Sequence, residues 1–244
     1  MRPVYLVMLP GLDGTGLLFR PLIDALPIFI KPILVNYPTD KKLDYDDLLN
    51  LVIKVLPKEE PFILLGESFS GPLAIRVAAT MPVGLKAVVL CASFITCPQK
   101  LVPTWASVLV FDFPFYATRI FAKINAWFGG YDGDDMQMAL SLVKPEVMAY
   151  RLRQVIKVNV TPELAQCNLP ILYLQGKDDI LVSHANFEQI KKNKPHVQYA
   201  QLSSGHLVLQ TQPKLAAKLI QDFIKEIMSK LLYCYSENSE KSRF

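Results

Sequence analysis

Cysteine and histidine are scarce in this sequence, which has four cysteines and three histidines among 244 residues. No cysteine lies in a C-x-x-C pair or at the spacing of a Cys/His metal site, so the sequence predicts no metal centre. A domain of this length buries enough apolar surface to be stable without a metal or a disulfide. Cys91 ends an apolar run and is expected in the core. The cysteine pattern suits a reducing compartment, and we expect a cytoplasmic protein.

Long apolar runs are also missing, because no stretch reaches the roughly 18 uninterrupted apolar residues of a membrane span. The sequence therefore predicts no transmembrane segment. The first apolar run stops at Pro10 and Gly11, which is too short for a secretory leader and typical of a buried strand that enters a loop. The net charge is only +4, and lysine and arginine are scattered rather than gathered in a stripe with aromatic residues. We therefore expect no nucleic-acid partner.

Short apolar runs alternate with segments of helical periodicity along the chain. The expected strands are residues 5–9, 33–36, 62–65, 87–91, 171–174 and 197–202. The expected helices are residues 17–26, 45–56, 70–80, 186–192 and 213–232. Several strands are apolar throughout, as is usual for parallel strands covered on both faces, and Asp44 is a candidate N-cap for the second helix. This order predicts an α/β fold built on a doubly wound, mostly parallel sheet.

The long connection between Cys91 and Ile171 contains no clear strand. It is rich in aromatic residues and shows helix-like stretches near 117–127 and 145–158. A compact domain does not carry a structureless loop of that length, so we expect an inserted helical cap over residues 98–167. The aromatic residues of this cap either line an apolar binding pocket or form the core of the cap itself. The expected core of the fold comprises residues 1–97 and 168–235, and the expected frayed polar tail comprises residues 236–244.

A candidate nucleophile follows the third expected strand. The chain there reads Gly66-x-Ser68-x-Ser70, which departs from the G-x-S-x-G pattern of a nucleophile elbow only at its last position. The flanking positions must be small so that strand and helix can approach closely, and Ser70, with Gly71 behind it, meets that requirement. The turn would lift the Ser68 hydroxyl out of the sheet and place a helix N-terminus beside it. The alternative is that Ser68 is an ordinary helix N-cap.

A serine hydroxyl needs a base to remove its proton, and the base in turn needs an acid to orient it. His206 is the candidate base because it lies directly after the last expected strand, whereas His184 and His196 are expected at the surface. The acid should lie between the serine and the histidine in chain order. Two neighbouring residues after the fifth expected strand, Asp178 and Asp179, compete for that role.

During attack by the serine, negative charge would develop on a substrate oxygen, and two backbone N–H groups would be needed to stabilise it. The residue after the nucleophile, Phe69, supplies one, and the loop after the first expected strand supplies the other. We expect that second donor to be Leu12, in a loop whose three glycines permit backbone conformations that other residues avoid. The loop matches neither a phosphate-binding P-loop nor the dinucleotide fingerprint, which are the rival interpretations of its glycines.

With these residues the chain resembles the α/β-hydrolase superfamily from about residue 5 to residue 232, as a small member of the serine esterase and thioesterase type. In related hydrolases the acid loop commonly reads G-x-x-D, a spacing that selects Asp179 over Asp178 when counted from Gly176. The loop Pro10-Gly11-Leu12-Asp13-Gly14-Thr15-Gly16 is similar to the P-G-x-D-G-T-G loop of small bacterial esterases. It is equally similar to that of plant esterase/lipase/thioesterase proteins that transfer acyl groups.

The resemblance implies a serine hydrolase that cleaves a carboxylic ester of a small molecule through a triad of Ser68, His206 and Asp179 and an acyl-enzyme intermediate. It implies no metal and no organic cofactor. One alternative is a thioesterase or acyltransferase on acyl-CoA or acyl-carrier substrates, with an acyl-carrier protein as partner. That alternative includes a methyl esterase for a carrier-bound acyl chain, as in biotin precursor synthesis. Another alternative is a non-catalytic hydrolase-fold protein that binds a ligand.

Overall fold

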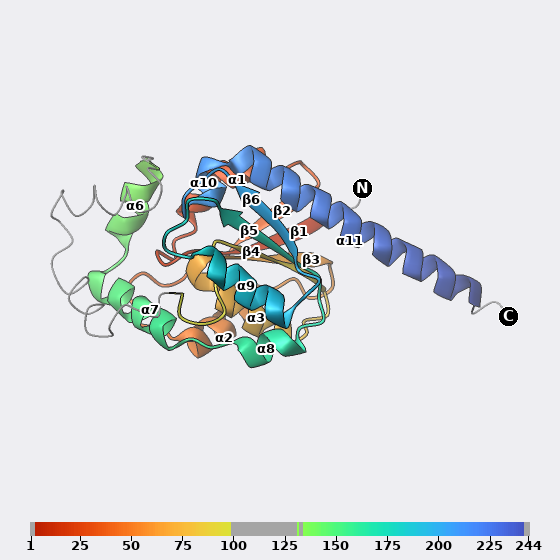
Figure 1. Cartoon of the computed structure of the whole chain (residues 1–244), viewed down its shortest axis with the longest axis horizontal. Helices are drawn as coiled ribbons and strands as arrows, with labels where there is room; N and C mark the ends of the chain where they lie inside the picture. Colours follow the sequence, from red (N-terminus) through yellow and green to blue (C-terminus); the bar gives the residue numbers. More distant parts are fainter. Residues whose placement is uncertain (1–2, 99–130, 132–133, 242–244) are drawn as a thin grey trace.

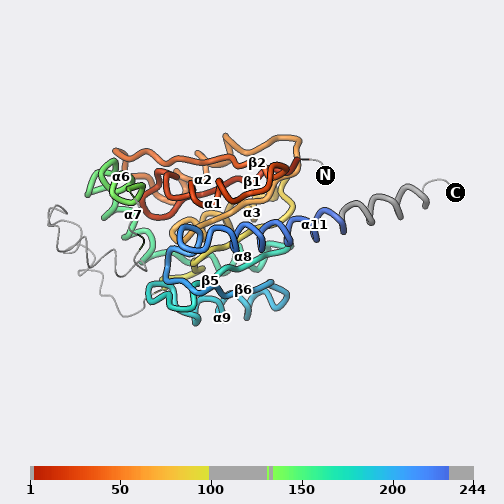
Figure 2. Tube along the Cα trace, turned by 90° about the horizontal axis from the view of Figure 1, so that it is seen from above, coloured from red at the N-terminus to blue at the C-terminus, as the bar shows by residue number. Residues whose placement is uncertain are grey.

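A computed structural model describes residues 3–98, 131 and 134–241 of the chain (Figure 1). Six strands form one sheet in the order β2-β1-β3-β4-β5-β6, and every neighbouring pair is parallel. Their bounds are β1 Val4–Leu9, β2 Ile30–Leu34, β3 Phe62–Glu67, β4 Leu85–Cys91, β5 Ile171–Gly176 and β6 Gln198–Leu202. The predicted doubly wound parallel sheet is thus confirmed. Figure 2 shows β2 and β1 toward one side of the sheet and β5 and β6 toward the other.

Helices cover both faces of this sheet (Figure 1). One face carries α2 Tyr45–Val55, α3 Gly71–Ala79, α8 Thr161–Gln166 and α9 His184–Asn193. The other face carries α1 Arg20–Ala25, α10 Val208–Thr211 and α11 Pro213–Lys241. The remaining described helices are η1 Leu17–Phe19, η2 Ser68–Ser70, α6 Asp134–Leu142 and α7 Pro145–Lys157. Figure 1 places α6 and α7 beyond the end of the sheet at which the strands finish.

Two apolar clusters, one on each face, hold the layers together. Successive residues of a strand point to opposite faces, so each central strand contributes to both clusters. In β1, Val7 and Leu9 pack into the cluster under α2 and α3, while Leu6 and Met8 pack into the cluster under α11. Cys91 is fully buried in the second cluster, as expected. Burial on both faces explains why the central strands are apolar throughout.

The predicted bounds of the edge strand and the predicted end of the last helix were wrong. Residues 33–36 were expected as a strand, but β2 begins three residues earlier, at Ile30. As the edge strand it keeps Lys31 and Pro32 exposed, and these two residues interrupt the apolar run between Ile30 and Ile33. An edge strand tolerates proline. The last helix, expected to end at 232, continues to Lys241 and takes in most of the expected polar tail. The chain has neither proline nor glycine after Pro213, so nothing in its propensities stops that helix.

The connection between β4 and β5 is partly described. The helix expected at 145–158 is found as α7, and α6 and α8 were not predicted. The helix expected at 117–127 and most of the aromatic residues of the expected cap lie outside the described residues. The helix α8 packs against α3 and α9, on the same sheet face as α2. Among the helices of the described residues, none is both long enough and apolar enough to cross a membrane.

Asp44 is the N-cap of α2, as the sequence predicted, and it forms a capping box with Asp47. The Asp44 carboxylate accepts hydrogen bonds from the N–H groups of Asp46 and Asp47, both at 2.9 Å. The Asp47 carboxylate accepts in turn from the Asp44 N–H, at 3.2 Å. Three donors that the first turn leaves without helical partners are thereby satisfied.

We expect the substitution Asp44→Ala to lower the free energy of unfolding by about 1 kcal/mol, because it removes the acceptor of two of these bonds. Urea denaturation measures the change. The matched control is Asp40→Ala, at an exposed position just before the helix, for which a change of less than about 0.5 kcal/mol is expected. Equal effects of the two substitutions would contradict a stabilising role for the capping box.

Candidate active site

The candidate residues gather at the carboxyl ends of the strands. Ser68 follows β3, Asp179 follows β5 and His206 follows β6. The strand order changes direction between β1 and β3, because the chain runs outward from β1 to β2 and then returns to β3. In open parallel sheets this point, at the carboxyl ends of the strands, is where ligands bind.

The turn that carries Ser68 leaves almost no space around it. Ser68 has a positive φ of 46°, a conformation that residues other than glycine rarely adopt. A Cβ on Gly66 would lie 2.6 Å from the carbonyl oxygen of Ser70, and a Cβ on Gly71 would overlap the Ser93 hydroxyl. Strand and helix therefore meet so closely that glycine is required on both sides of the turn, and the second glycine stands at position 71 rather than at position 70.

Ser70, which occupies the place of the usual glycine, has a structural task of its own. Its side chain is fully buried, and its hydroxyl donates a hydrogen bond to the carbonyl oxygen of Pro10. The hydroxyl of Tyr37 lies 2.7 Å from the same Ser70 oxygen. Because the single Ser70 proton goes to Pro10, Tyr37 acts as the donor in that pair. Ser70 thus joins the turn after β3 to the loop after β1.

A continuous line of hydrogen bonds joins the three candidate side chains. His206 Nε2 lies 2.8 Å from Ser68 Oγ, and His206 Nδ1 lies 2.8 Å from Asp179 Oδ2. The Asp179 carboxylate has no exposed surface, and His206 is 5% exposed. With a carboxylate as its partner Nδ1 carries the proton, so Nε2 is the acceptor for the Ser68 hydroxyl.

The structure brings Asp179, and not Asp178, to His206. The second carboxylate oxygen of Asp179 accepts from the N–H groups of Leu181 and Val182, both at 2.9 Å, which fixes its orientation. Asp178 is exposed, and its N–H donates to the Ser204 carbonyl at 3.0 Å, which joins the loop after β5 to the loop after β6. The carboxylate of Asp179 therefore has three hydrogen-bond partners and faces the imidazole.

The other two histidines lie away from this site. His184 begins α9, where it interacts with Glu188 and Gln175. His196 is exposed before β6. Neither takes part in the line of hydrogen bonds that contains His206.

The candidate oxyanion donors Leu12 and Phe69 lie in two loops that adjoin each other. The register of the parallel strands pairs Leu9 with Gly66, so the loops after β1 and β3 begin side by side. The carbonyl of Phe69 accepts a hydrogen bond from the Tyr45 hydroxyl at 2.8 Å, and the two rings stack at 4.9 Å. These contacts fix the peptide groups of η2, whose first N–H groups have no partner within the helix.

The loop after β1 is ordered by its own polar groups. The Asp13 carboxylate accepts from the N–H and the hydroxyl of Thr15, at 2.8 and 2.6 Å. The N–H of Gly14 donates to the carbonyl of Gly11 at 3.1 Å, and Gly14 has a positive φ of 72°. Leu12 therefore sits at the tip of a tight turn that glycine makes possible.

Glu67 and Gln210 were not predicted as members of the site. The Gln210 side-chain amide donates to the Glu67 carboxylate at 2.8 Å and to the carbonyl of Leu18 at 3.2 Å. Among the described residues, the Gln210 side-chain oxygen has no hydrogen-bond partner although it is buried. Burial raises the pKa of Glu67 to about 7, the bond from Gln210 opposes this shift, and the Asp13 carboxylate adds to it. A carboxyl group next to Ser68 therefore titrates near neutral pH.

Arg151 of α7 also reaches the site, and a sequence signal for it exists. The residue is 2% exposed. It falls between Val147 and Val155 on the buried stripe of its helix, at the four-residue spacing that places side chains on one face. A charged residue within an otherwise apolar stripe indicates a buried polar contact rather than a solvated face.

Comparison with known proteins agrees with the fold. The model of the alpha/beta hydrolase family matches residues 6–219. This match spans most of the chain, and the protein belongs to the α/β-hydrolase family.

Two curated proteins are similar to the chain in sequence. Phytyl ester synthase 1, chloroplastic, of Arabidopsis thaliana is 36% identical over 80 residues, which cover 30% of this chain and 11% of that protein. The biotin biosynthesis bifunctional protein BioHC of Cellvibrio japonicus (strain Ueda107) is 25% identical over 250 residues, covering 93% of this chain and 48% of that protein. The chain thus spans less than half the length of either relative.

Among solved structures, the esterase EaEST from Exiguobacterium antarcticum has a similar fold. It aligns with a TM-score of 0.78 over 92% of both chains, at 16% sequence identity.

The buried carboxyl of Glu67 predicts a pH-dependent stability. Its pKa in the folded chain, about 7, lies above the ordinary value of 4.5, so the fold favours the protonated form. The resulting stabilisation is fully present below the ordinary pKa and is lost as the pH rises through about 7. Relative to Glu67→Gln, the wild type should lose on the order of 3 kcal/mol of unfolding free energy between pH 4.5 and pH 8.

Urea unfolding of both proteins across that pH range measures the difference. Glutamine keeps an oxygen for the Gln210 amide but cannot titrate, and Glu60→Gln, at an exposed position before β3, is the control. A difference between wild type and Glu67→Gln that stays constant with pH would show that Glu67 does not titrate in this range.

Proposed function

We propose that this protein is a serine hydrolase that cleaves the carboxylic ester of a small acyl substrate. In this proposal Ser68 is the nucleophile, His206 the general base and Asp179 the orienting acid. The observation that carries the proposal is the line of two 2.8 Å hydrogen bonds from Ser68 through His206 to the buried Asp179. The positive φ of Ser68 adds support, because a strained turn at this place is typical of an exposed nucleophile.

The chemistry follows from the direction of these bonds. His206 Nε2 accepts the Ser68 proton while Ser68 Oγ attacks the ester carbonyl carbon, and Asp179 stabilises the imidazolium that forms. The tetrahedral intermediate collapses when His206 returns the proton to the leaving alkoxide oxygen, which departs as an alcohol. Water, deprotonated by His206, then attacks the acyl group on Ser68, and the acid is released.

Negative charge on the substrate oxygen would be stabilised by the N–H groups of Leu12 and Phe69. The N–H of Phe69 lies in the first turn of η2, where helical N–H groups lack partners and the helix dipole favours an anion. The N–H of Leu12 belongs to the tight turn after β1. Donors that folding fixes in advance cost no reorganisation during the reaction, and removing one such donor typically lowers kcat by about 10²- to 10³-fold.

A cap would give the substrate its apolar surroundings. We propose that residues 98–167 form this cap, inserted into a core of residues 1–97 and 168–235. The place of α6 and α7 at the carboxyl end of the sheet supports the assignment (Figure 1). A cap at this end would exclude water from the acyl-enzyme and set the length of the acyl chain.

Acyl transfer is the second candidate, because one relative is named as a phytyl ester synthase. The same Ser68 acyl-enzyme would then be attacked by an alcohol in place of water. A thioester donor on CoA or on an acyl-carrier protein fits the same triad. The carrier-bound methyl ester version gains support from the second relative, whose name places it in biotin biosynthesis. We rank hydrolysis first because water needs no acceptor site.

Labelling with a fluorophosphonate tests the nucleophile. The wild type should be labelled stoichiometrically and Ser68→Ala should not, since the probe captures an activated serine hydroxyl. The control is Ser183→Ala, at the exposed start of α9, which should be labelled as the wild type is. An unlabelled wild type would refute the proposal and favour a non-catalytic binding protein, whereas labelling of Ser68→Ala would show that another residue is the nucleophile.

A pair of neighbouring substitutions tests the acid. In Asp179→Asn the amide oxygen can keep the Leu181 and Val182 bonds, which turns the amide nitrogen toward His206 and forces the proton onto Nε2. Activity should fall by on the order of 10⁴-fold, whereas Asp178→Asn should keep activity within about twofold because that side chain is exposed. The reverse result would assign the acid to Asp178.

The rates on p-nitrophenyl esters and on acyl-CoA thioesters, with and without an added alcohol, then separate the two candidate reactions. Hydrolysis predicts free acid as the product under all conditions. Acyl transfer predicts that the alcohol diverts the product to a new ester.

A further inference from the structure

The buried guanidinium of Arg151 donates hydrogen bonds to the loop after β1. One terminal nitrogen of its guanidinium donates to the carbonyl oxygens of Leu12 at 2.9 Å and Asp13 at 2.6 Å. The other terminal nitrogen donates to the carbonyl of Pro38 at 2.9 Å. The side chain thus ties α7 to the loops that follow β1 and β2.

This arrangement is specific to the arginine. Within the described part of the chain no carboxylate forms an ion pair with Arg151, so backbone carbonyls satisfy the buried guanidinium. Burying a charge costs several kcal/mol unless its hydrogen bonds are made. Gly14 leaves the required space, because a Cβ there would lie 2.5 Å from the guanidinium nitrogen. The guanidinium of Arg151 therefore occupies space that exists only because residue 14 is a glycine.

The loop is held at its other end by the turn after β3. The Arg151 guanidinium lies over the Tyr37 ring, 5.6 Å from the ring centroid. The Tyr37 hydroxyl bonds to Ser70, and the Ser70 hydroxyl donates to the Pro10 carbonyl. Pro10 is therefore fixed from the nucleophile turn and Leu12 from α7. The Leu12 N–H lies between these two anchors.

We propose that Arg151 is a positioning residue that holds the loop of residues 10–14, so that the Leu12 N–H is aimed at the oxyanion of the tetrahedral intermediate. The inference rests on the proposed function, in which Leu12 is an oxyanion donor. Arg151 touches no reacting atom, because its bonds go to the carbonyl side of Leu12 and Asp13. A loop that shifts by about 1 Å loses the benefit of such a donor, which is worth on the order of 10²-fold in rate.

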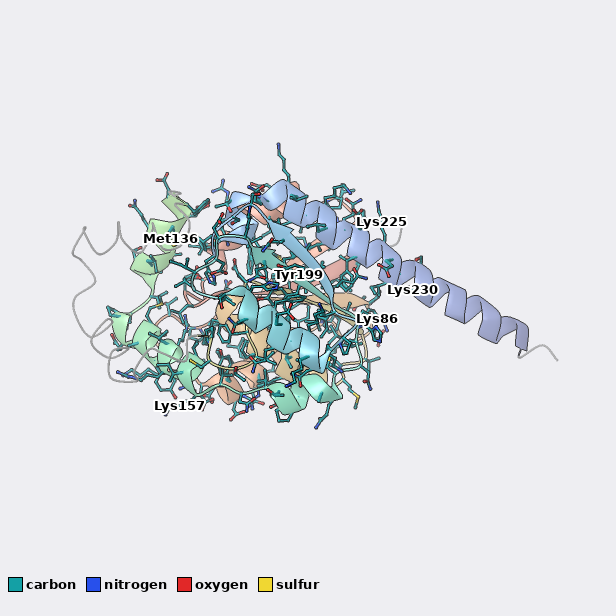
Figure 3. The ribbon with its side chains drawn as sticks, viewed as in Figure 1. Lys86, Met136, Lys157, Tyr199, Lys225 and Lys230 are labelled. Atoms are coloured by element: carbon teal, nitrogen blue, oxygen red, sulfur yellow. The ribbon has the colours of Figure 1, made fainter. Side chains whose placement is uncertain are left out.

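The test compares Arg151→Lys and Arg151→Met with the wild type. A lysine keeps the charge and up to three donors but cannot span two loops with a planar fork, and a methionine keeps only the apolar stem. Hydrolysis of p-nitrophenyl butyrate gives kcat and KM, with active sites counted by fluorophosphonate titration. The matched control is Lys157→Met, a cation at the outer surface of the same helix (Figure 3).

We expect kcat per active site to fall about 100-fold in Arg151→Met and about tenfold in Arg151→Lys, with KM changed by less than about threefold. Inhibition by a trifluoromethyl ketone adds a readout that a purely structural role would not move. Its adduct with Ser68 bears the oxyanion, so its inhibition constant should rise by the same factor as kcat falls. Lys157→Met should match the wild type in all three quantities.

The outcomes separate this inference from the proposed function. An active wild type whose Arg151→Lys variant keeps full kcat and full inhibitor affinity would overturn the positioning role alone. If Arg151→Met fails to fold, Arg151→Lys decides, and a loss of kcat without a rise in the inhibition constant would also overturn it. A wild type that neither hydrolyses the ester nor reacts with the fluorophosphonate would overturn the proposed function, and this inference with it.

Discussion

Close contact between β3 and α3 at the turn that carries Ser68 governs the arrangement of the site. Gly66 and Gly71 have no room for a Cβ, and the strained φ of Ser68 is held by the packing on both sides. Because the turn is so tight, α3 starts immediately and η2 presents free N–H groups beside the serine. Because the strands are parallel and in register, the loops after β1, β5 and β6 reach the same edge. Other folds could supply the three side chains, but this turn determines where they meet.

Three buried charged groups surround the turn, and their hydrogen-bond partners differ. Asp179 accepts two backbone N–H bonds besides that of His206, and Arg151 donates to three backbone carbonyls. Glu67 receives one amide bond, and burial raises its pKa toward neutrality. Burying these charges costs stability. In return, the polar groups around Ser68 are oriented by the fold, whereas water molecules in their place would have to reorient during the reaction. These buried charges therefore lie in the loops and strand ends that form the candidate active site.

Much of the fold and of the candidate site could be read from the sequence because both depend on local patterns. The central strands are buried on both faces and are visible as apolar runs, whereas β2 was misplaced because an edge strand needs no such run. Ser68, Asp179 and His206 follow strands in a fixed chain order, so their loops could be recognised one at a time. The position of Arg151 in an apolar helical stripe signals its burial, but its partners and those of Ser70 could not be assigned, because they are backbone carbonyls in loops distant in sequence. Every residue has a backbone carbonyl, so the amino-acid sequence does not reveal which carbonyl accepts such a bond.

The bond from Arg151 to Leu12 joins residues that are 139 positions apart. A growing chain makes the strand, the glycine loop and the nucleophile turn early, within its first third. The anchor that completes the glycine loop is synthesised only after the long segment between β4 and α7. Until that helix emerges and docks, the loop lacks its main polar tether and Gly14 borders an empty site. During synthesis the residues of the nucleophile turn are therefore made well before Arg151, whose hydrogen bonds anchor the glycine loop.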